Sequence, residues 1–326
     1  TVGWCYMITA VTFAYSSVLR GTGYVRVPMV VSITALSLKT FLNFGLIFGN
    51  FGLPAMGIQG AALSTVFART LECILMLSIS YIKKLPPAAK PRELFGFDRP
   101  FLTKVLKTAL PVLVNEMLWS FGITTYNMVY GRIGTDAIAA VNIAASIENL
   151  VFVVFMGVSE ATGIMIGHRI GAGEEHRAFG YARQTLIITN LGAMALGGII
   201  ILTANMVLSL YKLSPAALAN ARSILLVIGL LLWIRVGNMT VIVGILRAGG
   251  DTRFGMILDA GTVWLVGVPL ALMGGLVLHL PVYVVYLMVM AEEAVKYAIG
   301  LWRVRSRKWV HNLVKAPAEL EAVQTG

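Results

Sequence analysis

The chain has 326 residues, of which 58% are hydrophobic and only 13% are charged, and this composition excludes an ordinary soluble domain. Its formal net charge is +11 at pH 7, from 26 lysines and arginines against 15 aspartates and glutamates. The basic residues are spread over five connections between apolar stretches, where anionic lipid headgroups account for them. The composition therefore predicts a membrane protein with lipid partners and no nucleic-acid partner.

Nine apolar stretches follow one another, most of them long enough to cross a bilayer. The stretch at about 215–246 is long for one span, and we expect it to be tilted, bent or partly outside the bilayer. The first stretch reads as a span whose beginning is absent. We expect transmembrane helices at about 1–19, 28–49, 56–82, 106–130, 137–167, 183–205, 215–246, 253–275 and 281–302.

The connections between these stretches alternate in their content of lysine and arginine. Nineteen basic residues lie in connections on one side, three lie on the other side, and four lie inside the apolar stretches. Basic connections stay in the cytoplasm. The pattern predicts a multi-pass protein of the bacterial plasma (inner) membrane with a cytoplasmic C-terminus.

Charged and proline-rich residues separate two groups of helices. The segment KKLPPAAKPRELFGFDRP, which begins at Lys83, reads as a linker, and residues 173–183 read as a short amphipathic helix on the cytoplasmic surface. We expect a partial N-terminal bundle of three helices at 1–82, a cytoplasmic linker at 83–104, a six-helix bundle at 105–302 and a basic cytoplasmic tail at 303–326.

An internal repeat relates the two groups. Residues 18–29 match residues 245–256 at five of twelve positions, against roughly one expected from composition. The same offset of 227 places Pro54 on Pro281 and Arg69 on Lys296. It predicts an all-α protein with two six-helix bundles in a parallel repeat. The chain would hold the last three helices of the first bundle and all six of the second, with roughly 120 residues before Thr1 by the repeat length.

Five motifs carry a family resemblance: LRGTG and RVPM within 19–29, LNFGLIFGNFGLPAMGIQGAALSTVFAR at 42–69, ALPVLVNE at 109–116, GIMIGHRIGAG at 163–173 and GILRAGGDT at 244–252. With them the chain resembles the multidrug and toxic compound extrusion (MATE) family of secondary transporters. The resemblance implies an antiporter that is coupled to H⁺ or Na⁺ and exports lipophilic, often cationic, drugs by alternating access, and so confers multidrug resistance. It also places the family's cation-coupling glutamate at Glu116.

The small residues and the loop motifs can also be interpreted as purely structural features. Gly249 and Gly250 suit a tight turn, Asp251 or Thr252 can cap the next helix, and Arg247 suits a helix end at the headgroups. We read this loop mainly as a turn and a topology anchor. Small residues predict close helix packing in two sets: Gly57, Gly60, Ala61 and Ala62, and then Gly192, Ala195 and Gly198.

Acidic residues inside the apolar stretches are the candidates for cation coupling, because a buried charge in a membrane is costly. Glu116 lies about ten residues into its helix, or about 15 Å deep. Pro111, one turn and one residue earlier, can bend the helix toward a cavity. Apolar surroundings would let Glu116 take up H⁺, and Na⁺ is the other candidate ion; the alternative is a permanent pair with a base such as Arg235. Glu148 and Asp259 are further coupling candidates.

Polar and aromatic residues inside the stretches are candidates for a substrate cavity. Aromatic faces suit flat lipophilic cations, although the same residues could face lipid. The set is Asn115, Trp119, Tyr126, Asn142, Arg235, Asn238, Lys39 and Asn43. We expect Arg69 to pair with Glu72, and Glu292 with Lys296, because each pair is one helical turn apart.

Other function classes find little support. No Walker A, HExxH, GxSxG or CxxC motif is present, so we expect neither an enzyme nor a cofactor. The two cysteines lie in apolar stretches, where we expect neither a disulfide nor a metal cluster. The main alternative is a flippase of lipid-linked precursors from the same superfamily, since Lys39, Arg69, Arg235 and Lys296 could hold a pyrophosphate. A third reading is a membrane sensor or scaffold that does not transport. The expected partners of a transporter are a small-molecule substrate, H⁺ or Na⁺, lipids and the N-terminal helices.

Overall fold

The computed structural model describes residues 3, 5–90, 96 and 98–311, except for the side chains of residues 101 and 104. The chain divides into two compact units, Thr1–Arg99 and Pro100–Gly326. Both units are helical in the part of the chain that the structure describes. The expected all-α membrane fold is therefore confirmed.

The first unit is built from α1 (Cys5–Gly21), α2 (Arg26–Phe48) and α3 (Ile58–Ile82). Its α3 packs against both α1 and α2. The close approach of α2 and α3 requires a glycine at position 60, because a Cβ atom at Gly60 would lie 2.5 Å from the carbonyl oxygen of Leu46. The expected pair of Arg69 and Glu72 is confirmed, with 2.7 Å between Nη1 and Oε2.

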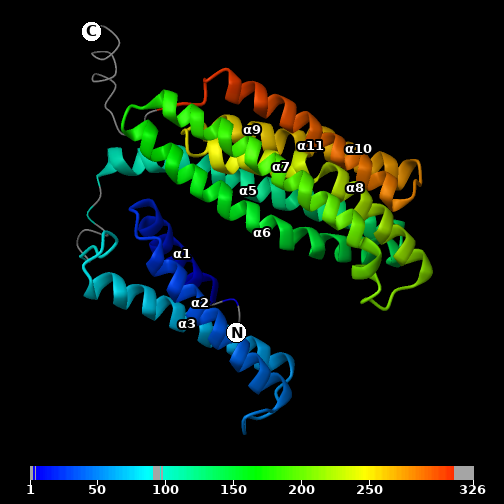
Figure 1. Cartoon of the computed structure of the whole chain (residues 1–326), viewed down its shortest axis with the longest axis horizontal. Helices are drawn as coiled ribbons and strands as arrows, with labels where there is room; N and C mark the ends of the chain where they lie inside the picture. The colour runs from blue at the N-terminus through cyan, green and yellow to red at the C-terminus, as the bar shows by residue number, and fades with distance from the viewer. Residues whose placement is uncertain (1–2, 4, 91–95, 97, 312–326) are drawn as a thin grey trace. The chain divides into compact units, whose positions relative to one another are not determined.

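The second unit is a bundle whose helices run back and forth beside one another (Figure 1). Two of its membrane segments are interrupted by π-helical turns: α8 continues into η2, and α9, η3, α10 and η4 follow one another without a break. The elements are α5 (Arg99–Ile133), α6 (Thr135–Gly171), α7 (Glu175–Leu208), α8 (Pro215–Met239), η2 (Thr240–Leu246), α9 (Thr252–Thr262), η3 (Val263–Gly267), α10 (Val268–Leu272), η4 (Met273–Val277) and α11 (Val282–Arg305).

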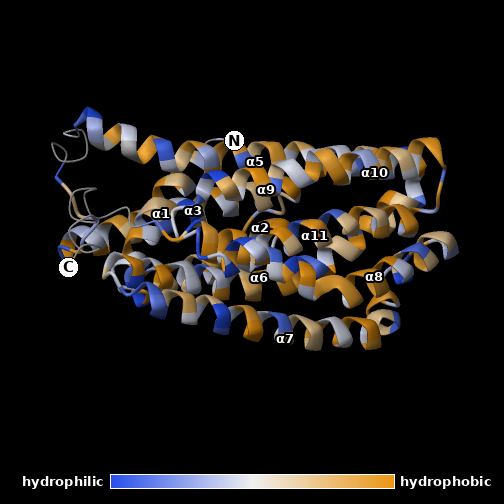
Figure 2. Cartoon of the chain, turned by 90° about the horizontal axis from the view of Figure 1, so that it is seen from above, coloured by the Kyte–Doolittle hydropathy of each residue, from blue (hydrophilic) through white to orange (hydrophobic). Residues whose placement is uncertain are grey.

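Six of the described helical segments are long and apolar enough to cross a membrane: Arg26–Phe48, Ile58–Ile82, Thr135–Gly171, Glu175–Leu208, Pro215–Leu246 and Thr252–Val277. Figure 2 shows that most residues along the helices are apolar, with hydrophilic residues at helix ends and at a few inner positions. Glu292, Glu293 and Lys296 lie in the middle of α11, a helix outside these six segments. The chain is a multi-pass membrane protein.

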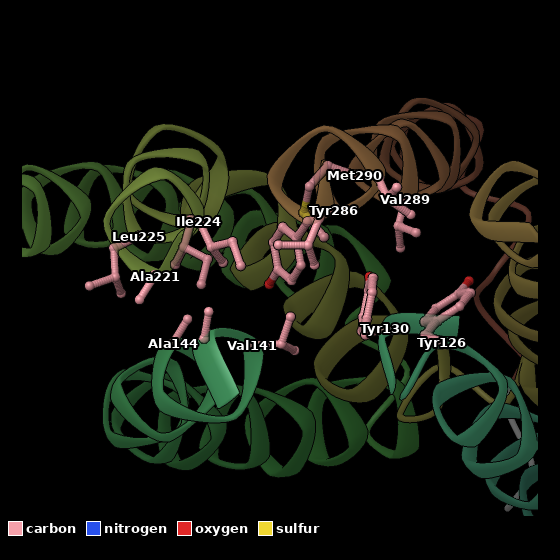
Figure 3. Packing of buried hydrophobic residues seen from close by; sticks show 14 of the residues in the cluster. Tyr126, Tyr130, Val141, Ala144, Ala221, Ile224, Leu225, Tyr286, Val289 and Met290 are labelled. Atoms are coloured by element: carbon pink, nitrogen blue, oxygen red, sulfur yellow. The ribbon is translucent and has the colours of Figure 1, made fainter. Parts of the chain in front are cut away.

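The core of the second unit lies between α5, α6, α7, α8, α10 and α11. Figure 3 shows Tyr286 and Met290 of α11 near Tyr130 of α5, and Ala144 of α6 facing Ala221 of α8. Tyr130 and Tyr286 have ring centroids 6.3 Å apart, a distance typical of favourable aromatic pairs. This packing fixes the helices that carry the charged residues described below.

Two predicted boundaries were wrong. The helix expected from residue 106 already begins at Arg99, within the predicted linker 83–104, because Pro100 is tolerated in the first turn of a helix; residues 91–95 and 97 of that linker lie outside the described residues. The separate amphipathic helix at 173–183 is instead the first part of α7. Its side toward the bundle carries the fully buried Ala178 and Ala182, so this part of the sequence packs on protein.

Ion pairs of Glu174 with Arg169 and Arg177 stabilise the turn between α6 and α7. Arg169 donates a hydrogen bond of 2.7 Å to Glu174, and Arg177 donates one of 3.0 Å. These two guanidinium groups, Arg169 first, lower the pKa of the Glu174 carboxyl. The tail expected at 303–326 begins inside α11, and residues 312–326 lie outside the described residues.

Two neighbouring glycines of α7 give a matched test of the packing. A Cβ atom at Gly197 would lie 2.1 Å from the carbonyl oxygen of Gly229 on α8, whereas a Cβ atom at Gly198 would meet nothing within 4 Å. The close contact is thus made by Gly197 rather than by the predicted Gly198. We expect Gly197→Ala to lower the thermal midpoint of the detergent-solubilised protein, because overpacking costs about 1–3 kcal/mol.

Gly198→Ala is the control, and it should leave that midpoint unchanged or raise it slightly, since alanine favours a helix over glycine by about 0.5–1 kcal/mol. Equal midpoints for the two variants would contradict the close approach of α7 and α8 at Gly197.

Candidate cation and substrate site

Two adjoining cavities lie inside the second unit, with volumes of about 250 and 380 Å³. They share four lining residues: Trp119, Phe152, Arg235 and Glu293. Five carboxylates and three cationic groups line the two cavities: Glu116, Glu148, Asp259, Glu292 and Glu293, with Arg235, Arg247 and Lys296. The lining therefore carries two more formal negative charges than positive ones.

Lys296 is the centre of one charge cluster. Its Nζ lies 2.8 Å from Asp259 Oδ1 and 2.6 Å from Glu292 Oε1, and Lys296 is only 3% exposed. Glu293 Oε2 lies at 3.8 Å. The expected pairing of Glu292 with Lys296 is confirmed, and α9 adds Asp259 as a second close partner.

Neutral side chains complete the hydrogen bonding of this cluster. Asn115 Nδ2 donates to Asp259 Oδ2 at 2.9 Å, and the Tyr126 hydroxyl donates to Glu292 Oε2 at 2.8 Å. These partners hold carboxylates at fixed positions in an apolar bundle, where unpaired charges are costly. Both donors come from α5, about three helical turns apart, so α5 is tied to α9 through Asn115 and to α11 through Tyr126.

Arg235 of α8 is the centre of the other cluster. Its Nη1 forms an ion pair with Glu148 on α6 and also donates to the Tyr286 hydroxyl at 3.2 Å. Its Nε lies 3.7 Å from Glu293 Oε1, and Asn238 donates to Glu293 Oε2 at 2.7 Å. Arg235 thus lines both cavities and also contacts a neighbouring helix through Glu148. Glu293 contacts both cations and so joins the two clusters.

Glu116 differs from the other acids of the site. Its side chain is 54% exposed, and its Oε1 lies 2.5 Å from Arg247 Nη2. The side chain of Glu116 faces the smaller cavity rather than the helix packing. The alternative of a pair with a base is therefore observed, but the base is Arg247, since Arg235 pairs with Glu148. Glu116 is the acid of the site with the simplest local pairing and the greatest exposure.

The π-helical turn η2 explains how Arg247 reaches the same cavity as Arg235. On an ideal α-helix, a residue twelve positions later is turned by about 120°. A π-helical turn advances more residues per turn, so η2 removes much of that rotation. The sequence predicts a headgroup position for Arg247 because the residue lies at a helix end. The structure instead places both guanidinium groups in the lining of the smaller cavity.

The remaining predicted site residues are placed as follows. Trp119, Arg235, Asn238, Glu116 and Asp259 line the smaller cavity, and Trp119, Tyr126, Asn142, Arg235 and Glu148 line the larger one. Asn115 is buried, donates a hydrogen bond to Asp259 and is not among the residues that line the two cavities. Asn43 pairs with Ser64 inside the first unit, where Lys39 is half-buried on α2.

The comparison with protein families decides the membership of the chain. Residues 111–273, half of the chain, match the MatE family model. The chain belongs to the MatE family. The match covers α5 from Pro111 to the first residue of η4, and thus the helices that supply Glu116, Glu148, Arg235 and Asp259.

Individual relatives agree with this membership. This MatE chain is 26% identical over 309 residues to the transporter YisQ of Bacillus subtilis, covering 95% of the chain and 68% of YisQ. It is 26% identical over 265 residues to the probable multidrug resistance protein NorM of Thermotoga maritima, covering 79% of the chain and 55% of NorM. The chain therefore spans little more than half the length of that relative.

A solved structure shows the same fold. A crystal structure of a MATE protein in complex with MaL6 superimposes with a TM-score of 0.78 at 20% sequence identity, over 92% of this chain and 68% of that one. At this identity the likeness concerns the fold alone.

Proposed function

We propose that this MatE protein is an antiporter that uses entry of H⁺ or Na⁺ to export lipophilic cations from a bacterial cell by alternating access. It would lie in the inner membrane with its C-terminus in the cytoplasm, as the distribution of basic residues indicates. The name of NorM, a probable multidrug resistance protein, supports drugs as substrates. The substrate, the ion and the orientation are parts of this proposal.

The excess of carboxylates in the two cavities is the observation that carries the proposal. Five acids against three bases leave room for added positive charge, whether a driving cation or a cationic substrate. Trp119, Phe152 and the tyrosines of the larger cavity provide aromatic faces beside these acids. Aromatic faces attract organic cations by about 0.5–2 kcal/mol each. A driving cation and a cationic substrate would therefore compete for the same negative charge.

Glu116 is our candidate for the residue that exchanges the driving cation. Its single described ion pair with Arg247 and its exposure to the cavity make it accessible. A cation on Glu116 would release Arg247 into the cavity, where the added positive charge repels a cationic substrate. Glu148 pairs with Arg235, and Asp259 pairs with Lys296. We propose that these two carboxylates stay ionised and do not exchange the driving cation.

Efflux of ethidium from vesicles tests the proposal. The protein, expressed from its complete native gene, is compared with Glu116→Gln under separate H⁺ and Na⁺ gradients. We expect efflux to follow one gradient and to fall by about tenfold or more in the variant, within the range of typical coupling free energies of about 1–3 kcal/mol.

The exposed acid Glu175, at the start of α7 and outside both cavities, gives the control Glu175→Gln, which should retain efflux. Full efflux by Glu116→Gln under every gradient would refute the role of Glu116.

The structure favours this function over a lipid-linked precursor flippase. Three of the four membrane cations that could hold a pyrophosphate already have carboxylate partners: Arg69 with Glu72, Arg235 with Glu148, and Lys296 with Asp259 and Glu292. A bound pyrophosphate would have to displace these acids. Absence of ethidium efflux, together with movement of a lipid-linked pyrophosphate across vesicles, would reverse the choice.

A further inference from the structure

The segment that follows α11 folds back on the loop between η2 and α9. We call residues 306–311 the C-terminal clasp. Trp309 of the clasp is fully buried, and its Nε1 donates to the carbonyl oxygen of Val304 at 3.1 Å. Its ring lies against Gly249, where a Cβ atom would come within 2.3 Å of Trp309 Cε3. The glycine at this position therefore makes room for the tryptophan, a role beyond that of a turn residue.

Backbone and charge contacts fasten the same two segments. Gly250 and Val310 form an antiparallel bridge, and the amide of His311 donates to the carbonyl oxygen of Gly249 at 2.8 Å. Just before the clasp, Arg303 Nε lies 2.7 Å from Asp251 Oδ2. Asp251 is thus a partner of α11, although the sequence suggested a helix cap. The loop is held along its length from Gly249 to Asp251.

This loop carries Arg247, the partner of Glu116. The amide of Gly250 donates to the carbonyl oxygen of Arg247 at 3.2 Å, and that of Asp251 donates to Leu246 at 2.9 Å. Hence Arg247 is fixed from one side by η2 and from the other by a turn that the clasp covers. Gly249, under the Trp309 ring, is two residues along the chain from Arg247, whose guanidinium lies 2.5 Å from Glu116.

We propose that the C-terminal clasp positions Arg247 against Glu116 and thereby sets the affinity of the coupling site for its driving cation. Trp309 and Gly249 are positioning residues in this scheme, and neither contacts the cation. The proposal rests on the proposed function, in which Glu116 exchanges the cation. A loosened clasp lets Arg247 leave Glu116, and the unpaired carboxylate then binds the driving cation more tightly.

Gly249→Ala tests this proposal, because it pushes Trp309 away without removing a charge. The control is Gly261→Ala on α9, where a Cβ atom would meet nothing within 4 Å. We expect the half-saturating concentration of the driving cation for efflux to fall about three- to tenfold in Gly249→Ala, the size of effect typical of residues that modulate coupling without contacting the ligand. For a proton-driven transporter, the pH midpoint of efflux would rise correspondingly. Gly261→Ala should shift the midpoint less than twofold.

A double-mutant cycle separates positioning from general damage. In an Arg247→Gln background there is no guanidinium to position, so Gly249→Ala should add no further shift. Trp309→Phe should restore most of the wild-type midpoint relative to Trp309→Ala, because a phenyl ring still fills part of the space. A loss of folded protein in Gly249→Ala with an unchanged midpoint would overturn the proposal, as would an equal shift in the Arg247→Gln background.

A second measurement does not depend on transport. Dicyclohexylcarbodiimide reacts with protonated carboxyl groups in apolar surroundings, and mass spectrometry can read its adduct on Glu116. We expect faster modification of Glu116 in Gly249→Ala than in wild type or Gly261→Ala. Equal rates would refute the positioning role even if efflux is cation-driven. Faster modification without any cation-driven efflux would support the positioning and refute the proposed function.

Discussion

Replacing Lys296 with methionine is expected to be the most damaging single substitution in the second unit. Its ammonium group is the close partner of both Asp259 and Glu292, and it is almost completely buried. Methionine has a similar length but no charge, so two carboxylates would remain without their cation. Removing one partner of a buried ion pair costs about 3–5 kcal/mol. A domain of this size would lose roughly 6–20 °C in thermal midpoint, at about 2–4 °C per kcal/mol.

The measurement is the thermal midpoint and the monodisperse fraction after detergent extraction. Lys212→Met, at an exposed position in the loop between α7 and α8, is the control and should behave like wild type. The double variant Lys296→Met with Glu292→Gln should recover part of the loss, because it leaves one fewer unpaired carboxylate. If Lys296→Met matched Lys212→Met, the ion pairs around Lys296 would not contribute to stability.

The helical fold could be predicted from the sequence, because hydrophobic length and the charge of the connections are local properties. Seven of the nine expected stretches coincide with described helical segments to within a few residues at each end, for example 56–82 with Ile58–Ile82 and 281–302 with Val282–Arg305. The boundaries at Arg99 and Glu175 could not be predicted in this way. There the helix continues beyond the apolar stretch, and polar residues pack on protein or lie at the surface. The parallel repeat between the two groups of helices stays a prediction.

The identities of the membrane acids could also be predicted, but most of their partners could not. Pairs within one helix, such as Glu292 with Lys296, follow from helical spacing. Lys296 with Asp259 and Arg235 with Glu148 join different helices, and a single sequence holds no signal for such contacts. Glu293 follows Glu292 in the sequence and is three residues from Lys296, but it was not among the predicted site residues. The structure shows that it joins both clusters.

Arg247 was missed for a specific physical reason. An α-helical reading of residues 215–246 places it about 120° away from Arg235, and its position at the helix end suggests a headgroup anchor. The π-helical turn η2 changes that direction, and the clasp contacts at Gly249 hold the following loop. Neither feature has a hydrophobic pattern of its own. The length of the stretch, which predicted a bend or tilt, was the one signal that the helix is irregular.

Opposite changes in substrate affinity are expected when Arg235 and Glu148 are neutralised separately. Arg235→Met raises the excess negative charge of the cavities by one unit, whereas Glu148→Gln lowers it by one unit. A unit charge about 8–16 Å from a bound cation contributes about 1–2 kcal/mol at an effective dielectric constant of about 20. We therefore expect ethidium to bind roughly five- to thirtyfold more tightly to Arg235→Met and more weakly, by a similar factor, to Glu148→Gln.

Three controls make this a test of charge rather than of damage to the fold. A neutral lipophilic dye of similar size should bind both variants alike, because the change is electrostatic. Arg222→Met, in the α7–α8 pocket away from the two cavities, should leave ethidium binding unchanged. The double variant Arg235→Met with Glu148→Gln restores the original excess of charge and should bring the affinity back toward wild type. Weaker ethidium binding in both single variants would mean that the pair of Arg235 and Glu148 shapes the cavity. The excess negative charge of the cavities would then not select the substrate, and the main support for cationic substrates would be lost.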